Sequence, residues 1–477
     1  AQCVPEQGDW YGRLMYMQGE HDYDYQVAHY GHPSKVGFKE IDHLWHADNW
    51  DPEKLMQLYK RAGAKYFVAL ANHHDNFDCY DSKYQPWNSV NIGPHKDIVG
   101  IWAKIARENG LRFAVSVHAA HAWSWFEVAQ GSDKTGPLAG VPYDGKLTKA
   151  DGKGTWWEGL DPQDLYAQNH LPGKQLSWDW KPEEGSSIPD KAYCEKFFNR
   201  TVDLINKYSP DAIYFDDTIM PLNNVSDVGL RLVSHFYNSN IKLHGGKLEA
   251  VVNTKGLNPD QRKCVVWDIE RGLSDRIQPQ PWQTDTCIGQ WHYDRSIFEK
   301  HEYKTPALVI GMLADIVSKN GNLLLSIPVR GDGSIDDDEI QFLHNMSKWM
   351  DVNSECIFGT RPFTIFGEGP IESADDHKHG ASNFNEGNRR PLGAKDIRFT
   401  TKGDVLYAIV LGWPDDGKVT IHSLAKNSPN YNGEIASIEL LGSSAKLQWK
   451  RDENALTITL PNEKPCEYAI ALKIRGK

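Results

Sequence analysis

The sequence predicts an α/β protein whose first part is a (β/α)₈-like (TIM) barrel and whose last part is an antiparallel β-sandwich. Short apolar runs alternate with amphipathic helical patterns up to about Arg361, and repeated βα units indicate a parallel sheet. Beyond Arg361 the chain changes to short alternating strands with turns between them, the pattern of a sandwich. A chain of 477 residues is too long for one compact domain. We therefore expect a barrel domain over residues 1–365 and a sandwich over 366–477.

The barrel elements follow from local patterns. A helix over 52–61 begins with Asp51 as its cap and Pro52 in its first position. No G-x-G-x-x-G follows the first strand, which excludes a dinucleotide-binding fold. We count seven candidate strands where a closed barrel has eight. Six of these strands are the β-rich runs 66–70, 112–117, 212–215, 249–252, 264–267 and 323–327, and the other helical patterns are 97–109, 191–208, 225–237 and 307–319.

A long segment over 128–190 follows the second strand and is rich in Gly, Lys, Asp and Trp. Because barrel sites lie at the carboxyl ends of the strands, this insertion is expected to cover that rim. The sandwich strands are expected at 397–400, 405–411, 418–423, 435–441, 445–450, 455–460 and 467–474.

Composition excludes several classes of function. The net charge of -12 argues against a nucleic-acid partner, which needs a basic face. No apolar stretch reaches 18 residues, so no membrane span is expected. The seven cysteines form no C-x-x-C pair and are interpreted as buried thiols. Many of the 17 tryptophans stand among polar residues, where they suit either packing or stacking on sugar rings: Trp123, Trp125, Trp156, Trp157, Trp178 and Trp180.

Carboxylates end two of the predicted strands. Asp216 and Asp217 end the run over 212–215, and Asp268 and Glu270 follow the run over 264–267. A barrel brings strand ends into one shared mouth, so these carboxylates can face each other across a substrate. Glycoside hydrolysis needs such a pair, one group to attack the anomeric carbon and one to protonate the leaving oxygen. The alternative is that each aspartate only caps the following helix.

His73 and His74 directly follow the first strand. Neighbouring residues of an extended segment point in opposite directions, which disfavours a shared metal ion. A neutral imidazole offers one donor and one acceptor and suits sugar hydroxyls better. The acidic run 336–339 lacks the spacing of a calcium loop and is interpreted as a helix N-terminus.

The segment from His73 to Gly100, HHDNFDCYDSKYQPWNSVNIGPHKDIVG, resembles the HHDGF…WDSKYT…WN…GPKRDIVGEL segment of the glycoside hydrolase family 29 α-L-fucosidases. The resemblance implies a retaining exo-acting α-L-fucosidase that uses no metal and no other cofactor. It also implies a fucosylated oligosaccharide or glycoconjugate as substrate and a periplasmic or extracellular location, although the sequence shows no signal peptide. Agreement with the family extends to about residue 365, through the segments 110–113, 282–289, 317–325, 331–333 and 357–362.

The catalytic residues are carried over one at a time. Asp216 matches the family's nucleophile, and Asp217 stands where the family usually has Gly. Some members carry a Glu after the tryptophan that Trp282 matches, but here that residue is Gln283, which cannot act as a carboxylic acid. Glu270 is therefore the best candidate for the acid/base, and Asp268 is the alternative.

The sugar contacts are carried over in the same way. His73 and His74 match residues that bind fucose hydroxyls, and His118 falls where many members have Tyr. Trp10 matches an aromatic contact, and Trp282 is also expected to bind substrate.

One departure from the family concerns the start of the barrel. Members open with a strand reading roughly FG-x-F-x-HWG-x-Y-S-V-P, which this sequence does not show. The first barrel strand is therefore expected to be missing. Either the natural protein is longer, or the barrel closes differently and activity is lost. Two other functions stay open, a retaining glycosidase for a related sugar such as galactose and a non-catalytic carbohydrate-binding protein.

Overall fold

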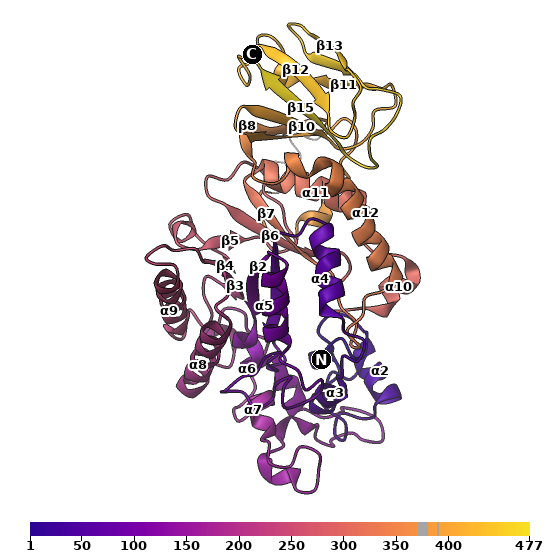
Figure 1. The fold of residues 1–477 in the computed structure, drawn as a ribbon. Coiled ribbons are helices and arrows are strands. Elements are labelled where there is room, and N and C mark those ends of the chain that lie inside the picture. The colour runs from indigo at the N-terminus through magenta and orange to yellow at the C-terminus, as the bar shows by residue number, and fades with distance from the viewer. Residues whose placement is uncertain (371–379, 389–390) are drawn as a thin grey trace.

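The structure, a computed structural model, describes residues 1–370, 380–388 and 391–477. Figure 1 shows an α/β body that carries a smaller all-β part beyond β7. The predicted fold class, a TIM-like barrel followed by antiparallel sheets, is confirmed.

A parallel sheet of seven strands forms the centre of the body, in the order β1-β2-β3-β4-β5-β6-β7. Every neighbouring pair is parallel, because each connection passes through helices or loops outside the sheet. The strands are β1 (Tyr66–Asn72), β2 (Arg112–Val117), β3 (Ala212–Thr218), β4 (Val251–Lys255), β5 (Val266–Asp268), β6 (Trp282–Cys287) and β7 (Gly321–Ser326).

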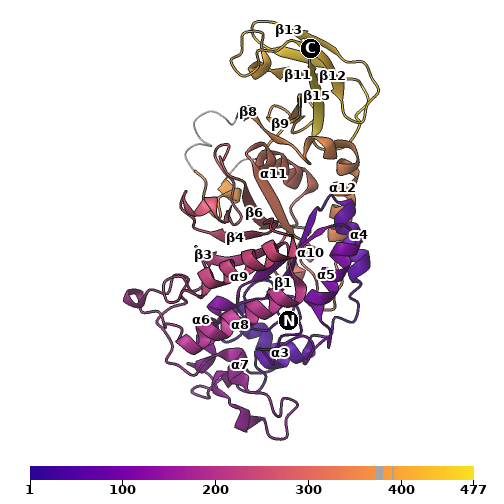
Figure 2. The same ribbon diagram turned by 60° about the vertical axis from the view of Figure 1, so that its left-hand side comes forward.

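The helices pack on the outside of this sheet, and their starts follow capping rules. Asp51 accepts a hydrogen bond from the Lys54 amide at the start of α4, and Asp336 forms a capping box with Glu339 at the start of α12. Figure 2 brings α8 and α9 to the front, side by side. The helices are α1 (Tyr11–Leu14), α2 (His21–His29), α3 (Phe38–Leu44), α4 (Pro52–Arg61), α5 (Ile98–Glu108), α6 (Ala122–Trp125), α7 (Pro162–Tyr166), α8 (Lys191–Tyr208), α9 (Val228–Leu243), α10 (Arg295–Lys300), α11 (Pro306–Ser318) and α12 (Asp337–Asn353).

The barrel is open between β1 and β7. Within the described residues these two edge strands share no ladder, and the gap is bridged by Tyr66, whose hydroxyl donates to the Leu323 carbonyl at 2.9 Å. A cavity of about 1630 Å³ runs along this seam, lined on its apolar part by side chains that include Leu70 and Leu325. In the part of the chain that the structure describes, this sheet has seven strands and a free edge at each end, as the seven candidate strands of the sequence predict.

The insertion over 128–190 has no strand among its described elements, which are short helical turns and α7. It is anchored to the N-terminal helices by a buried polar cluster around Asp144, which accepts hydrogen bonds from Tyr16, Tyr166 and Lys39. Its residue Trp178 lines the same cavity. The insertion therefore covers the carboxyl-end rim, as predicted.

The C-terminal part contains a five-stranded and a three-stranded antiparallel sheet, in the orders β12-β15-β10-β9-β8 and β11-β14-β13. Apolar side chains from both sheets, such as Phe399 and Ile458, form its core. β8 crosses the domain boundary set at residue 365, and that division stays a prediction. The strands are β8 (Arg361–Glu368), β9 (Ile397–Lys402), β10 (Val405–Val410), β11 (Lys418–Ile421), β12 (Ile435–Leu440), β13 (Gln448–Arg451), β14 (Leu456–Thr459) and β15 (Ile470–Gly476).

Buried charges join the two parts. Arg398 on β9 donates to Asp315 on α11 at 2.6 Å, and Lys319 pairs with the same carboxylate at 2.8 Å. Among residues 1–370, 380–388 and 391–477, no helix is both long and apolar enough to cross a bilayer.

Candidate active site

Asp216 lies near the carboxyl end of β3 with its side chain in the cavity. Its Oδ2 is 3.0 Å from His118 Nδ1 and 3.3 Å from His74 Nε2. Its Oδ1 contacts Lys255 Nζ. The carboxylate thus has donors on both oxygens, which holds it in one orientation.

Glu270 lies two residues beyond β5 and reaches the same ammonium group. Its Oε2 contacts Lys255 Nζ, and its backbone N–H donates to Asn383 Oδ1 at 3.1 Å. Lys255 ends β4, the strand between β3 and β5. Three consecutive strands therefore place two carboxylates around one cation.

The environment separates the two carboxylates in pKa. Burial alone would raise the pKa of Asp216, but the Lys255 ammonium and His118 outweigh it and hold that pKa well below its usual range. Burial and the charge of Asp216 raise the pKa of Glu270, and Lys255 lowers it. The net result is a pKa of about 7. At neutral pH one carboxylate is ionised while the other is poised to hold a proton, the condition for a nucleophile beside a general acid.

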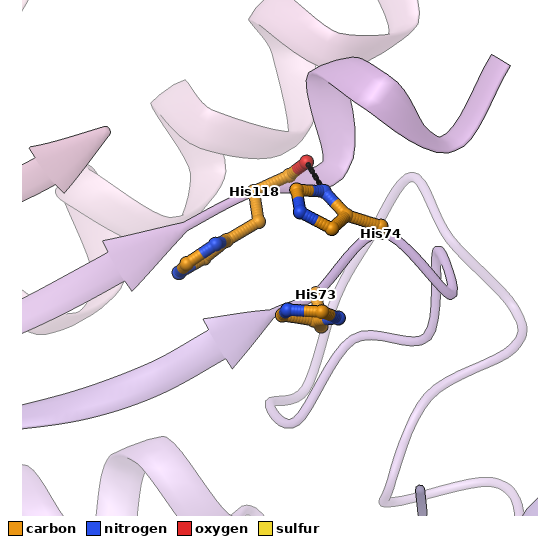
Figure 3. A group of neighbouring side chains, drawn as sticks. All are labelled: His73, His74 and His118. Atoms are coloured by element: carbon orange, nitrogen blue, oxygen red, sulfur yellow. Dashed lines mark hydrogen bonds between the residues drawn. The ribbon is translucent and has the colours of Figure 1, made fainter. Parts of the chain in front are cut away.

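Figure 3 shows His73, His74 and His118 close together, and two of them, His74 and His118, contact Asp216. His74 Nδ1 donates to the His118 carbonyl at 3.0 Å, and His73 Nδ1 lies 2.8 Å from Gln2 Nε2. Burial lowers the pKa of His74 to about 4, and burial with the neighbouring imidazoles holds the pKa of His73 well below its usual range. Both rings are therefore neutral at pH 7, and each has one donor and one acceptor nitrogen.

The same three histidines bring ring nitrogens within 4.8 Å of one another, a spacing that one metal ion requires. His118, however, engages Asp216 through Nδ1 and Ser116 Oγ through Nε2. An ion at this residue would have to replace one of these hydrogen bonds.

Aromatic side chains form the rim of the site. Trp10 lines the cavity at 36% exposure. Its ring packs edge-on against Trp125 with a centroid distance of 5.0 Å and lies 5.9 Å from Trp178 of the insertion. Partly exposed indoles next to polar groups are suited to stacking on a sugar.

The structure does not bring Trp282 into this site, and that prediction is wrong. Trp282 is the first residue of β6, at the amino end of the strand, whereas the site lies at the carboxyl ends. Its side chain is 1% exposed, and its indole N–H donates to the Lys319 carbonyl at 2.9 Å. It packs in a separate apolar cluster with Ile316 and Met312.

Asp217 points away from Asp216, as strand alternation predicts. Its Oδ1 pairs with His121 Nε2 at 2.9 Å, and both side chains are almost fully buried. Asp268 is 0% exposed and lies deeper in the sheet interior, whereas Glu270 lines the cavity and meets the Lys255 ammonium.

Sequence reasoning missed Lys255 and Tyr214. Lys255 is the last residue of β4, and Asp216 lies near the end of β3, so the rule that sites lie at strand ends applies to both. Lys255 was missed because the predicted strand ended at residue 252. Tyr214 precedes Asp216 by two residues and therefore points to the same side of the sheet. Its hydroxyl lies 3.5 Å from Asp216 Oδ1.

Comparison with known proteins agrees with this geometry. A sequence model of the family described as Alpha-L-fucosidase matches residues 1–355, which is most of the chain. A second model, Alpha-L-fucosidase C-terminal domain, matches residues 392–475. The chain belongs to the α-L-fucosidase family.

Relatives in this α-L-fucosidase family cover nearly the whole chain. The tissue alpha-L-fucosidase of Homo sapiens is 25% identical over 99% of this chain and 85% of its own length. The alpha-L-fucosidase of Branchiostoma floridae is 24% identical over 96% of this chain and 86% of its own length. As a member of the family, the chain is a glycoside hydrolase.

Solved structures show the same fold. The Thermotoga maritima alpha-fucosidase in complex with a mechanism-based inhibitor superposes with a TM-score of 0.70 at 22% identity, covering 99% of this chain and 92% of its own. The same Thermotoga enzyme in complex with fucose gives a TM-score of 0.67 with the same identity and coverage.

Proposed function

We propose that this α-L-fucosidase is a retaining, exo-acting enzyme that removes terminal α-L-fucosyl residues by double displacement, with Asp216 as nucleophile and Glu270 as acid/base. One observation carries the assignment of roles. The two carboxylates contact the same ammonium, yet the pKa of Asp216 lies well below its usual range while that of Glu270 is raised to about 7.

In the first step Asp216 attacks the anomeric carbon while Glu270 gives its proton to the leaving oxygen. A fucosyl ester forms on Asp216, and the bond to the leaving group breaks. In the second step the ionised Glu270 takes a proton from water, and the resulting hydroxide displaces Asp216. Two inversions leave the released fucose with the configuration of the substrate.

The separation of the carboxylates supports a retaining outcome. Because Asp216 and Glu270 both contact Lys255 Nζ, their nearest oxygens lie no more than two hydrogen-bond lengths apart, about 6 Å. Retaining enzymes have the carboxyl groups about 5–5.5 Å apart, whereas inverting enzymes leave about 6.5–9.5 Å for a water molecule.

The glycone contacts come from His73, His74, His118 and Trp10. The neutral His73 and His74 pair with sugar hydroxyls, and Trp10 covers an apolar face of the sugar. The substrates are fucosylated oligosaccharides or glycoconjugates, and family membership favours a periplasmic or extracellular enzyme. Fractionation of the native host cells, with activity assayed in each fraction, tests the location.

Hydrolysis of 4-nitrophenyl α-L-fucoside, compared with the α-D-galactoside, tests the activity. We expect turnover of the fucoside and little of the galactoside, with α-fucose as the first product seen by proton NMR. Preference for the galactoside would indicate an enzyme for a related sugar. Binding of fucose without turnover of either substrate would indicate a carbohydrate-binding protein.

A further inference from the structure

A second pair of carboxylates lies beneath the active site, in the sheet interior. Asp268 at the end of β5 and Asp285 on β6 are 0% and 4% exposed. Asp268 is paired with Gln283 across the two strands, and Asp285 follows Gln283 by two residues, so both carboxyls lie on the same side of the sheet. The charge of Asp285 is among the causes that raise the pKa of Asp268.

The donors around this pair satisfy only half of its oxygens. Asp268 Oδ1 accepts from Gln283 Nε2 at 2.8 Å, and Asp285 Oδ2 accepts from the Tyr214 hydroxyl at 3.0 Å. Asp268 Oδ2 and Asp285 Oδ1 are buried and have no donor among the residues that the structure describes. Two ionised carboxylates facing each other in this way would each bury an unpaired charge, at a high cost in free energy.

We propose that Asp268 and Asp285 share a single proton, and that the one negative charge left on Asp285 positions Tyr214 and sets the charge balance of the Asp216–Lys255–Glu270 group. This inference rests on the proposed roles of Asp216 and Glu270. A proton on Asp268 Oδ2 that is donated to Asp285 Oδ1 completes every hydrogen bond of the pair.

The surroundings place this proton on Asp268. Burial and the neighbouring Asp285 raise the pKa of Asp268 well above its usual range. Asp285 accepts a hydrogen bond from the Tyr214 hydroxyl, and we place the negative charge of the pair on this carboxylate.

Asp285 also decides where the Tyr214 proton points. The Tyr214 hydroxyl is 3.0 Å from Asp285 Oδ2 and 3.5 Å from Asp216 Oδ1. A phenol has one proton, and the shorter contact to a charged acceptor takes it. Asp216 is thereby spared a hydrogen bond that would stabilise its ground-state carboxylate and weaken it as a nucleophile.

The charge on Asp285 also acts on Glu270, because it is one of the charges that raise the pKa of Glu270. The ionisable groups around the pair come from five strands, and neutralising the pair changes their net charge by one. These groups are Tyr66 on β1, Tyr214 and Asp216 on β3, Lys255 on β4, Glu270 beyond β5, and the pair itself on β5 and β6.

The test compares Asp268→Asn with the double variant Asp268→Asn/Asp285→Asn in the pH dependence of kcat/KM for 4-nitrophenyl α-L-fucoside. If Asp268 is already neutral, Asp268→Asn leaves the alkaline limb where it is in the wild type. The double variant removes the charge and moves that limb to lower pH by roughly one unit. A comparable shift in Asp268→Asn alone would mean that both carboxylates are ionised, and the proposal would be overturned.

A second measurement does not depend on turnover. Infrared spectra of the full-length protein, labelled with ¹³C-carboxyl aspartate, should show at pH 7 a carbonyl band of a protonated carboxyl that Asp268→Asn removes. An unchanged band in a folded Asp268→Asn variant overturns the shared proton. An inactive wild type that still shows this band would count against the proposed function and leave the proton sharing intact.

Discussion

Asp216 and Glu270 come from different strands but contact the same ammonium group, Lys255 Nζ. Because one cation serves both, it lowers the pKa of each carboxyl, and only the differences in their other neighbours separate them. Asp216 also contacts His118, which lowers its pKa further, whereas the pKa of Glu270 is raised by its burial and by the charge of Asp216. This asymmetry gives the two residues different protonation states at neutral pH.

Replacing Asp216 by Gly should lower kcat for 4-nitrophenyl α-L-fucoside by roughly 10⁴-fold or more, because no group remains to form the ester. Added azide should restore part of the rate and give the fucosyl azide of inverted configuration, which NMR identifies. Asp217→Asn is the matched control, since Asp217 pairs with His121 and does not share the contacts of Asp216 with Lys255 and His118. If Asp216→Gly kept activity and Asp217→Asn lost it, the nucleophile assignment would be wrong by one residue.

Replacing Glu270 by Gln should slow the first step of hydrolysis far more for a fucosylated disaccharide than for the aryl fucoside. The reason is that 4-nitrophenol leaves without needing a proton from the enzyme. Azide should then accelerate the second step of the aryl substrate and give a product of retained configuration. Kinetics with both substrates, with and without azide, measure this. Equal losses on both substrates without an azide effect would place the acid elsewhere.

The pH profile of the wild type follows from the two pKa directions. Glu270 must be protonated to act as acid, so kcat/KM for a natural linkage should fall as pH rises through about 7. Asp216 must be ionised, and its pKa is held well below its usual range, so no loss from this group is expected down to the ordinary aspartate pKa of about 3.9. Initial rates from pH 4 upward, with enzyme stability checked at each pH, test both limbs. An alkaline limb well above pH 8 would contradict the acid role of Glu270.

Removing the shared cation by Lys255→Met should move both limbs upward. The ammonium lowers the pKa of Asp216 and of Glu270, so its loss raises both, by roughly one unit or more. Activity at pH 5 should therefore fall more than activity at pH 8. Lys255→Arg keeps the charge and is the control, and a Lys255→Met profile that superposes on the wild type would refute the shared-cation role.

Arg200 on α8 should be important for stability and for the loop that carries the histidines. Its guanidinium donates to Asp78 at 2.6 Å and to Asn76, and Arg200 and Asp78 are both buried. Arg200→Met leaves the Asp78 charge buried and unpaired, which costs about 3–5 kcal/mol of unfolding free energy. Urea unfolding followed by tryptophan fluorescence measures the loss. Lys477→Ala, which breaks an exposed pair with Glu434, should superpose on the wild-type curve, and a similar curve for Arg200→Met would contradict the prediction.

Local sequence determined the elements and part of the site. Strand–helix alternation located most of the parallel strands and the main helices, because apolar periodicity and caps such as Asp51 are local properties of the chain. Strand-end reasoning brought Asp216 and Glu270 together, because parallel strands open their carboxyl ends on the same rim. Alternation within β3 also separated Asp216 from Asp217.

Tertiary structure alone decided which groups surround those carboxylates. The sequence motif suggested that Trp282 lies at the site. In the structure Trp282 is the first residue of β6, so it lies at the opposite end of the sheet from the catalytic rim. Lys255 and Tyr214 come from separate strands, and their contacts with Asp216 depend on the order and curvature of the sheet. The pKa values that distinguish Asp216 from Glu270 depend on burial and on charges far apart in sequence. These pKa shifts arise only once the chain is folded, because they depend on burial and on the distances to charges from other strands, which no local sequence pattern contains.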